Sequence, residues 1–146
     1  MNVSSQHNIG AYVAVATSVE PQAAAAGTIN GAAIDRAART NPLSCVMHTI
    51  AGADTGAPTT LSVQSQLQHS PDNSTWTNYT DPSTGNAAQA AALTAVNTEN
   101  SLAIDLGNAY RYIRVQTVVA FTGGTSPTAE IAADLVLAGE DTLPAT

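Results

Sequence analysis

Residues Thr59–His69 read TTLSVQSQLQH, and the side chains of this stretch follow the two-residue alternation of a β-strand. Two sets of side chains alternate along it. They are Leu61, Val63, Ser65 and Leu67 in one set and Ser62, Gln64, Gln66 and Gln68 in the other. Because successive side chains of a strand point to opposite faces of a sheet, the pattern predicts an antiparallel strand with one face in the core and one in water.

Other stretches of the chain carry β-type patterns of the same kind. They are Ala11–Val19, Ser44–Ile50, Thr75–Tyr79, Ser101–Leu106, Arg111–Phe121 and Ile131–Leu137. Turn-forming residues separate them, among them Ser70-Pro71-Asp72-Asn73, which predicts a hairpin, and Gly123-Gly124, which predicts a tight reversal. Residues 87–93 fit a loop, a short helix or a poorly patterned strand. Strands with one wet face do not form a parallel sheet, so we predict an all-β protein, an antiparallel β-sandwich that is either immunoglobulin-like or a jelly roll.

The β pattern is unevenly distributed along the 146 residues, a length that suits one domain. It is dense after residue 43, whereas Pro21–Asn41 is rich in Ala and Gly and has little bulk. We therefore expect residues 1–42 to form an N-terminal strand and an extended Ala/Gly-rich arm. Residues 43–139 are expected to form the sandwich domain, and residues 140–146 a C-terminal tail.

Composition argues against several classes of partner. The formal net charge is −7, and the only cations besides histidine are Arg36, Arg39, Arg111 and Arg114, so we expect no nucleic-acid binding. Cys45 is the single cysteine, which excludes an internal disulfide. No secretion signal and no long apolar stretch is recognisable, so we expect no membrane partner and synthesis in the cytoplasm.

No constellation of residues predicts catalysis. His7, His48 and His69 lie far apart and lack companions at metal-ligand spacing, and Gly123-Gly124-Thr125 lacks the lysine of a phosphate-binding loop. The carboxylates fall mainly at turns or on polar strand faces. We expect a protein that is not an enzyme, with no catalytic residues, no metal and no cofactor.

One surface patch stands out as a candidate for binding. Tyr112 and Arg114 share the strand face opposite Ile113 and Val115, which would place an aromatic ring beside a cation. We favour the alternative, in which the Arg114 stem covers the sheet while its head group pairs with an acid such as Asp105. Trp76, Tyr79 and Tyr112 are the candidates for stacking on a glycan.

Several short motifs carry a resemblance. LQHSPDNSTW at Leu67–Trp76 and AYRYIRV at Ala109–Val115 are similar to recurring pieces of small β-sandwich domains, including discoidin-type carbohydrate or lipid binders. Together with NGAAIDR at Asn30–Arg36, FTGGTSP at Phe121–Pro127 and LVLAG at Leu135–Gly139, they resemble small virion proteins of tailed bacteriophages, above all head decoration, or cement, proteins.

The resemblance implies a non-enzymatic protein on the outer surface of the virion capsid. Its partner would be the major capsid protein, and it would clamp neighbouring capsomers as a homo-oligomer, with a trimer expected. The arm would lie on the shell, with Asn30, Ile34, Asp35, Arg36 and Arg39 as capsid contacts. Two alternatives stay open: a discoidin-like glycan-binding module, and another virion part such as a head–tail connector or a tail subunit.

Overall fold

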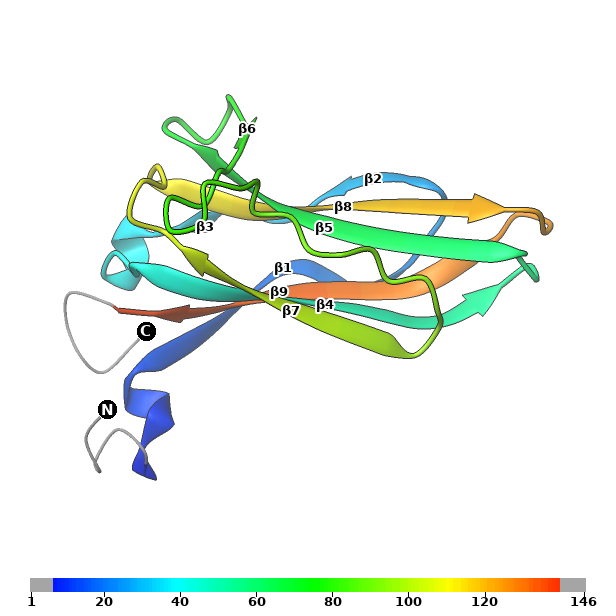
Figure 1. Cartoon of the computed structure of the whole chain (residues 1–146), viewed down its shortest axis with the longest axis horizontal. Coiled ribbons are helices and arrows are strands. Elements are labelled where there is room, and N and C mark those ends of the chain that lie inside the picture. The colour runs from blue at the N-terminus through cyan, green and yellow to red at the C-terminus, as the bar shows by residue number, and fades with distance from the viewer. Residues whose placement is uncertain (1–6, 140–146) are drawn as a thin grey trace.

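The computed structural model describes residues 7–139 and consists of two antiparallel sheets packed face to face (Figure 1). The strands are β1 (Val13–Ala24), β2 (Gly27–Asn30), β3 (Ile34–Asp35), β4 (Ser44–Thr55), β5 (Thr60–Ser70), β6 (Thr77–Asn78), β7 (Thr98–Asp105), β8 (Tyr112–Thr122) and β9 (Thr128–Ala138), with short 3-10 turns η1 (Ile9–Ala11) and η2 (Ala37–Arg39). Sheet A has the order β1-β9-β4-β7. Sheet B has the order β2-β8-β5-β6, with β3 also paired to β8. The predicted all-β antiparallel sandwich is confirmed.

The strand order decides between the two topologies that the sequence leaves open. Without the two-residue β3, the strands counted along the chain form one sheet in the order first, eighth, third, sixth and a second in the order second, seventh, fourth, fifth. This is the strand order of a jelly roll. Successive strands β8 and β9 therefore lie in different sheets, so the segment at Gly123-Gly124 is an arch between sheets and not the predicted tight hairpin. Both glycines have positive φ, 67° and 81°.

The core lies between the inner faces of the two sheets. The predicted alternation in β5 is confirmed, because Leu61, Val63 and Leu67 are at most 5% exposed whereas Gln64 and Gln66 face outward and are half-buried. Fully buried partners come from sheet A; they include Met47, Leu135 and Leu137. Burial of each such side chain contributes about 1.5–3 kcal/mol to folding.

The N-terminal region is extended as predicted, but it is not an arm. β1 pairs with β9 from Val13↔Ala138 to Ala24↔Ala129, and β2 and β3 pair with β8. The boundary at residue 42 is therefore wrong, because a strand at the edge of a sheet is held by backbone hydrogen bonds and needs little side-chain bulk. β1 also continues through Pro21, which an edge strand tolerates. Residues 1–6 and the predicted tail 140–146 lie outside the described residues.

Ser18 lies on β1 of sheet A and is hydrogen-bonded to sheet B at the point where the chain passes from β2 to β3. Its side-chain hydroxyl accepts a hydrogen bond from the Val115 N–H of β8 at 2.9 Å and donates one to the Ala32 carbonyl at 3.0 Å. The Val115 carbonyl accepts a hydrogen bond from the Gly31 N–H. A Cβ atom at position 31 would clash with Ser18 Oγ, so this crossing requires glycine.

At the other edge of sheet B, residues 87–93 lie along β5. They form neither a helix nor a regular strand. Leu93 exchanges two backbone hydrogen bonds with Val63 of β5, at 2.8 and 2.9 Å. Further along, the Leu67 N–H donates to the Ala88 carbonyl at 2.8 Å. The segment therefore covers β5 as an irregular edge, and the side chains of Ala88, Ala90 and Leu93 are buried.

Replacing Ser18 should destabilise the protein more than its size suggests. In Ser18→Ala, the buried Val115 N–H loses its acceptor, and an unsatisfied buried donor costs about 1–3 kcal/mol. Ser101→Ala, at an exposed position of β7, is the matched control and should change stability by less than about 0.5 kcal/mol. Urea denaturation measures both variants, and equal stability of the two would contradict the bridging role of Ser18.

Candidate binding surfaces

Arg36, expected to contact a capsid, is buried inside the protein. It is 8% exposed, and its guanidinium donates hydrogen bonds to the carbonyl oxygens of Pro42, Ala109 and Tyr110. Burial lowers the pKa of Arg36, although an arginine stays charged at any ordinary pH. Arg36 thus ties η2 and its following loop to the loop before β8, and the prediction of a surface contact is wrong.

The other residues predicted to contact a capsid also take part in contacts within the fold. Ile34 is buried, 6% exposed. Asp35 accepts two hydrogen bonds from Arg111, at 2.9 and 2.7 Å, and these bonds lower the pKa of the Asp35 carboxyl. The exposed Asn30 accepts a hydrogen bond from Gln116 Nε2 at 2.8 Å, and Arg39 ends η2 in a half-buried position. These residues do not form one free contact surface.

Tyr79 does not belong to the predicted surface patch. It is 2% exposed, and its hydroxyl donates to the Asp105 carbonyl at 2.7 Å. Its ring meets the His69 ring edge-on, with 5.0 Å between centroids, and His69 in turn stacks on Tyr110 at 4.4 Å. The Tyr79 ring therefore anchors the segment after β6 to the core, and its availability for stacking on a ligand is a wrong prediction.

Trp76 and Arg114 do come together on the outer face of sheet B. The Arg114 guanidinium lies over the Trp76 ring, 4.2 Å from its centroid. Its Nε and Nη2 atoms both donate to Gln68 Oε1, at 2.9 and 2.8 Å, and Gln68 Nε2 donates to Asn78 Oδ1 at 2.9 Å. The alternative pairing of Arg114 with Asp105 is wrong. Tyr112 is half-buried on the same strand, with Arg111 5.1 Å from its ring centroid.

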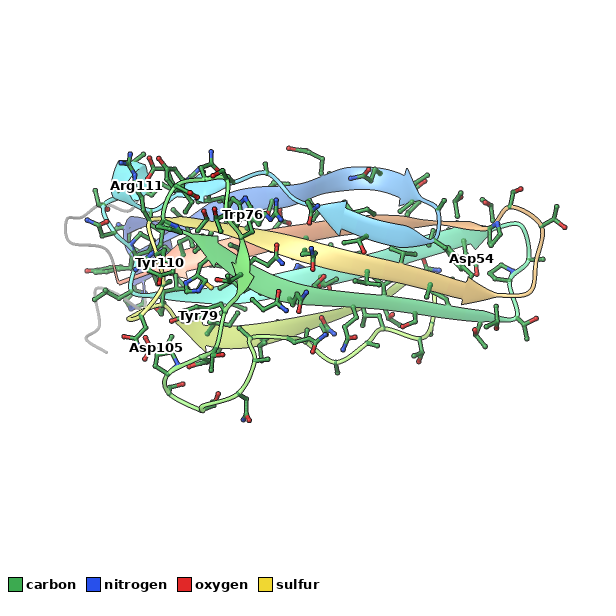
Figure 2. The ribbon with its side chains drawn as sticks, turned by 90° about the horizontal axis from the view of Figure 1, so that it is seen from above. Asp54, Trp76, Tyr79, Asp105, Tyr110 and Arg111 are labelled. Atoms are coloured by element: carbon green, nitrogen blue, oxygen red, sulfur yellow. The ribbon has the colours of Figure 1, made fainter. Side chains whose placement is uncertain are left out.

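The turn before β6 places Trp76. The Asp72 carboxylate accepts hydrogen bonds from the backbone N–H groups of Ser74 and Thr75, at 2.9 and 2.7 Å. These bonds hold the pKa of Asp72 well below its usual range. Figure 2 shows Trp76, Tyr110 and Arg111 at one end of the sandwich, with Asp54 at the other. The acidic turn is therefore a structural support for the Trp76–Arg114 pair.

A row of amide side chains continues this polar face. Gln66 Nε2 donates to Gln116 Oε1 at 2.5 Å, and Gln116 Nε2 donates to Asn30 Oδ1, so hydrogen-bonded amides cross β5, β8 and β2. Sequence reasoning did not identify this row. The alternating glutamines at 64, 66 and 68 signal it, but their partners become visible only with the strand register.

The outer face of sheet A is different, because an apolar row crosses all of its strands. Val15, Val136, Val46 and Ala103 are direct cross-strand neighbours on β1, β9, β4 and β7. Val15 is 62% exposed and Val46 37% exposed. A β-bulge after Thr17 shifts the alternation along β1, so Val19 is buried although Val15 faces outward.

Two shallow hollows flank the polar centre of this face. One, of about 340 Å³, is lined by Val13, Val46 and Val136 among others, and the second, of about 220 Å³, by Pro21, Ile50 and Ala132 among others. Between them lie Asp134 and its cross-strand neighbour His48, whose Nε2 is 3.0 Å from Glu99 Oε2. The sheet A face thus combines apolar hollows with a polar strip.

These features define a jelly-roll module with two unlike outer faces, one apolar and one rich in amides. No protein-family model matches the chain, and no curated protein matches it significantly. Within residues 7–139, no three His, Cys, Asp or Glu side chains gather in a way that suits a metal ion. No helix in this range has the length and hydropathy needed to cross a bilayer.

The stability of the fold should depend on pH through His69. Burial, and secondarily the charge of Arg36, lowers the pKa of His69 from 6.5, and its Nδ1 accepts a hydrogen bond from the Tyr110 N–H at 3.2 Å. The unfolded chain therefore binds a proton more readily, and stability is lost as pH falls from about 6.5 toward the folded-state pKa.

Urea midpoints between about pH 7.5 and about pH 5.5 measure this effect, because carboxylates with lowered pKa values titrate below that window. His69→Gln should flatten the pH dependence in this window, whatever its effect on absolute stability. An unchanged slope in that variant would show that the proton is taken up elsewhere.

Proposed function

We propose that this chain is a non-enzymatic decoration, or cement, protein that binds the outer surface of a tailed-bacteriophage head and stabilises contacts between capsomers. The observation that carries the proposal is the apolar row Val15–Val136–Val46–Ala103, which is open to solvent on the outer face of sheet A. The resemblance of the sequence motifs to head decoration proteins supports it. So does the jelly-roll topology, which recurs in viral capsid domains but does not fix function by itself.

The sheet A face has the make-up of a protein-binding surface. Apolar side chains with room between them lie beside a polar strip that includes His48, Glu99 and Asp134. Specific interfaces likewise combine apolar contacts with polar groups, and they bury about 1,600 Å² in total. The proposed occupant is the outer surface of the major capsid protein.

The capsid contact proposed from the structure thus differs from the arm expected from the sequence. Residues 13–35 are committed to the two sheets, so a broad sheet face replaces an extended segment as the binding element. A homo-oligomer, with a trimer expected, would present several such faces to the shell, and modest contacts then add through multivalency. The net charge of −7 suits a location on the side of the shell away from packaged DNA.

Two valines, one on the outer face of each sheet, test whether sheet A binds the capsid. Val46→Asp on sheet A should weaken binding to assembled heads by about tenfold or more, because a charge would be buried without a partner. Val118→Asp on the outer face of sheet B, where Val118 is 41% exposed, should bind like the wild type. Co-sedimentation with heads that lack the protein measures both, and thermal melts confirm that both variants fold.

Equal binding of the two variants to heads would contradict the role of sheet A. Binding of the wild-type protein to tails or to the head–tail junction, seen by electron microscopy, would favour a different virion part. Failure to bind any particle would overturn the proposal of a virion protein.

A further inference from the structure

We propose that the outer face of sheet B binds a saccharide that carries a carboxylate, with Arg114 as the contact for the carboxylate and Trp76 as the surface on which the sugar ring stacks. This site is independent of the capsid contact. It lies on the opposite sheet, so both surfaces can be occupied at once.

The charge distribution singles out Arg114. Arg111 is paired with Asp35, and Arg36 is buried among backbone carbonyls. Arg114 has no carboxylate partner within residues 7–139; two of its nitrogen atoms share Gln68 Oε1, and Nη1 makes no hydrogen bond in that range. A half-buried cation with an unused donor, in a chain of net charge −7, suits an anionic group of a ligand.

The surroundings of Arg114 suit hydroxyl groups. The strands around Arg114 carry one outward carboxylate, Asp35 of β3, which lies beside Tyr112 and is paired with Arg111. The other outward side chains of β2, β5 and β8 are mainly amides, hydroxyls and small apolar groups. They include Thr28 and Asn30 of β2, Ser62, Gln64, Gln66 and Gln68 of β5, and Gln116, Val118, Ala120 and Thr122 of β8. Each amide offers both donors and an acceptor, which matches the paired donor and acceptor character of sugar hydroxyls.

Trp76 adds a flat apolar surface beside these polar groups. It is half-buried just before β6, and the Arg114 guanidinium lies over its ring, 4.2 Å from the centroid. A tryptophan with a wet edge stacks on apolar faces of ligands while its N–H hydrogen-bonds. Gln68 accepts hydrogen bonds from Arg114 and donates one to Asn78, and these bonds fix the geometry before a ligand arrives, which reduces the entropy lost on binding.

The presence of a single available cation on this face also limits the class of ligand. Nucleic acids and other dense polyanions need several clustered cations to replace their counterions, and this face offers Arg114 alone among unpaired arginines of the described chain. A saccharide unit with a single carboxylate among neutral hydroxyls matches this face, because the carboxylate pairs with the one cation and the hydroxyls hydrogen-bond with the amides.

Sialyllactose and lactose test the site, because they differ by one carboxylate-bearing sugar. Trp76 is the only tryptophan, so its fluorescence in the full-length protein reports directly on the proposed site. We expect sialyllactose, or the uronic acid probe digalacturonate, to change this fluorescence with saturation, and lactose to bind at least about tenfold more weakly. The two acidic probes separate sialic acid from uronic acid sources.

Variants complete the test by calorimetry. Arg114→Gln should weaken binding of the acidic probe by about tenfold or more and remove the preference over lactose, because a charge-assisted contact is lost. Trp76→Ala should weaken binding of both sugars. Arg111→Gln is the matched control and should retain wild-type affinity, since Arg111 is already paired with Asp35.

Three results would overturn the proposal: no response to either acidic probe, equal affinity for lactose and sialyllactose, or unchanged affinity in Arg114→Gln. The outcome is separate from that of the capsid proposal, because Val46→Asp leaves this face intact. Loss of head binding in that variant with sugar binding retained would support the use of different faces.

Discussion

The side-chain hydroxyl of Ser18 provides a hydrogen bond that strand pairing alone cannot supply. β8 pairs along one edge with β2 and then with β3, and between these two partners the Val115 N–H faces a gap in the ladder. Ser18 fills the gap from β1, a strand of the other sheet, while Gly31 leaves room for the approach. Since an unpaired buried N–H is costly, this contact keeps the two sheets joined at one edge. Residues 87–93 cover the other edge.

The outer faces of the two sheets are the broadest surfaces of the described fold, and they have opposite chemistry. Sheet A exposes Val15 and Val46 beside two hollows, which suits a protein surface. Sheet B exposes the hydrogen-bonded amides Gln66, Gln116 and Asn30 and, as a separate group, the Trp76–Arg114 pair held by Gln68. The same core thus carries two unlike outer faces, and we propose a different partner for each.

Local patterns in the sequence predicted most of the strands, because alternation depends only on neighbouring residues, as in Leu61–Leu67. Long-range pairing was not predictable, since Ser18 and Val115 are 97 residues apart. The same limit explains the errors at Arg36, whose carbonyl partners include residues 73 and 74 positions away, and at Tyr79, whose partner is Asp105. Alternation in β8 correctly predicted that Arg114 faces outward. The aromatic ring predicted beside it was Tyr112, whereas Arg114 lies over Trp76, and Tyr112 contacts Arg111.

Residues 13–35 belong to the jelly roll and do not form an arm. Hydrogen–deuterium exchange of the backbone amides tests this placement most directly, because paired amides exchange slowly and those of a detached segment exchange freely. We expect protection of the β1 and β2 amides, and of the Val115 N–H, well above that of exposed loops such as residues 82–86. Free exchange throughout residues 13–30, with β4, β5, β8 and β9 still protected, would contradict it.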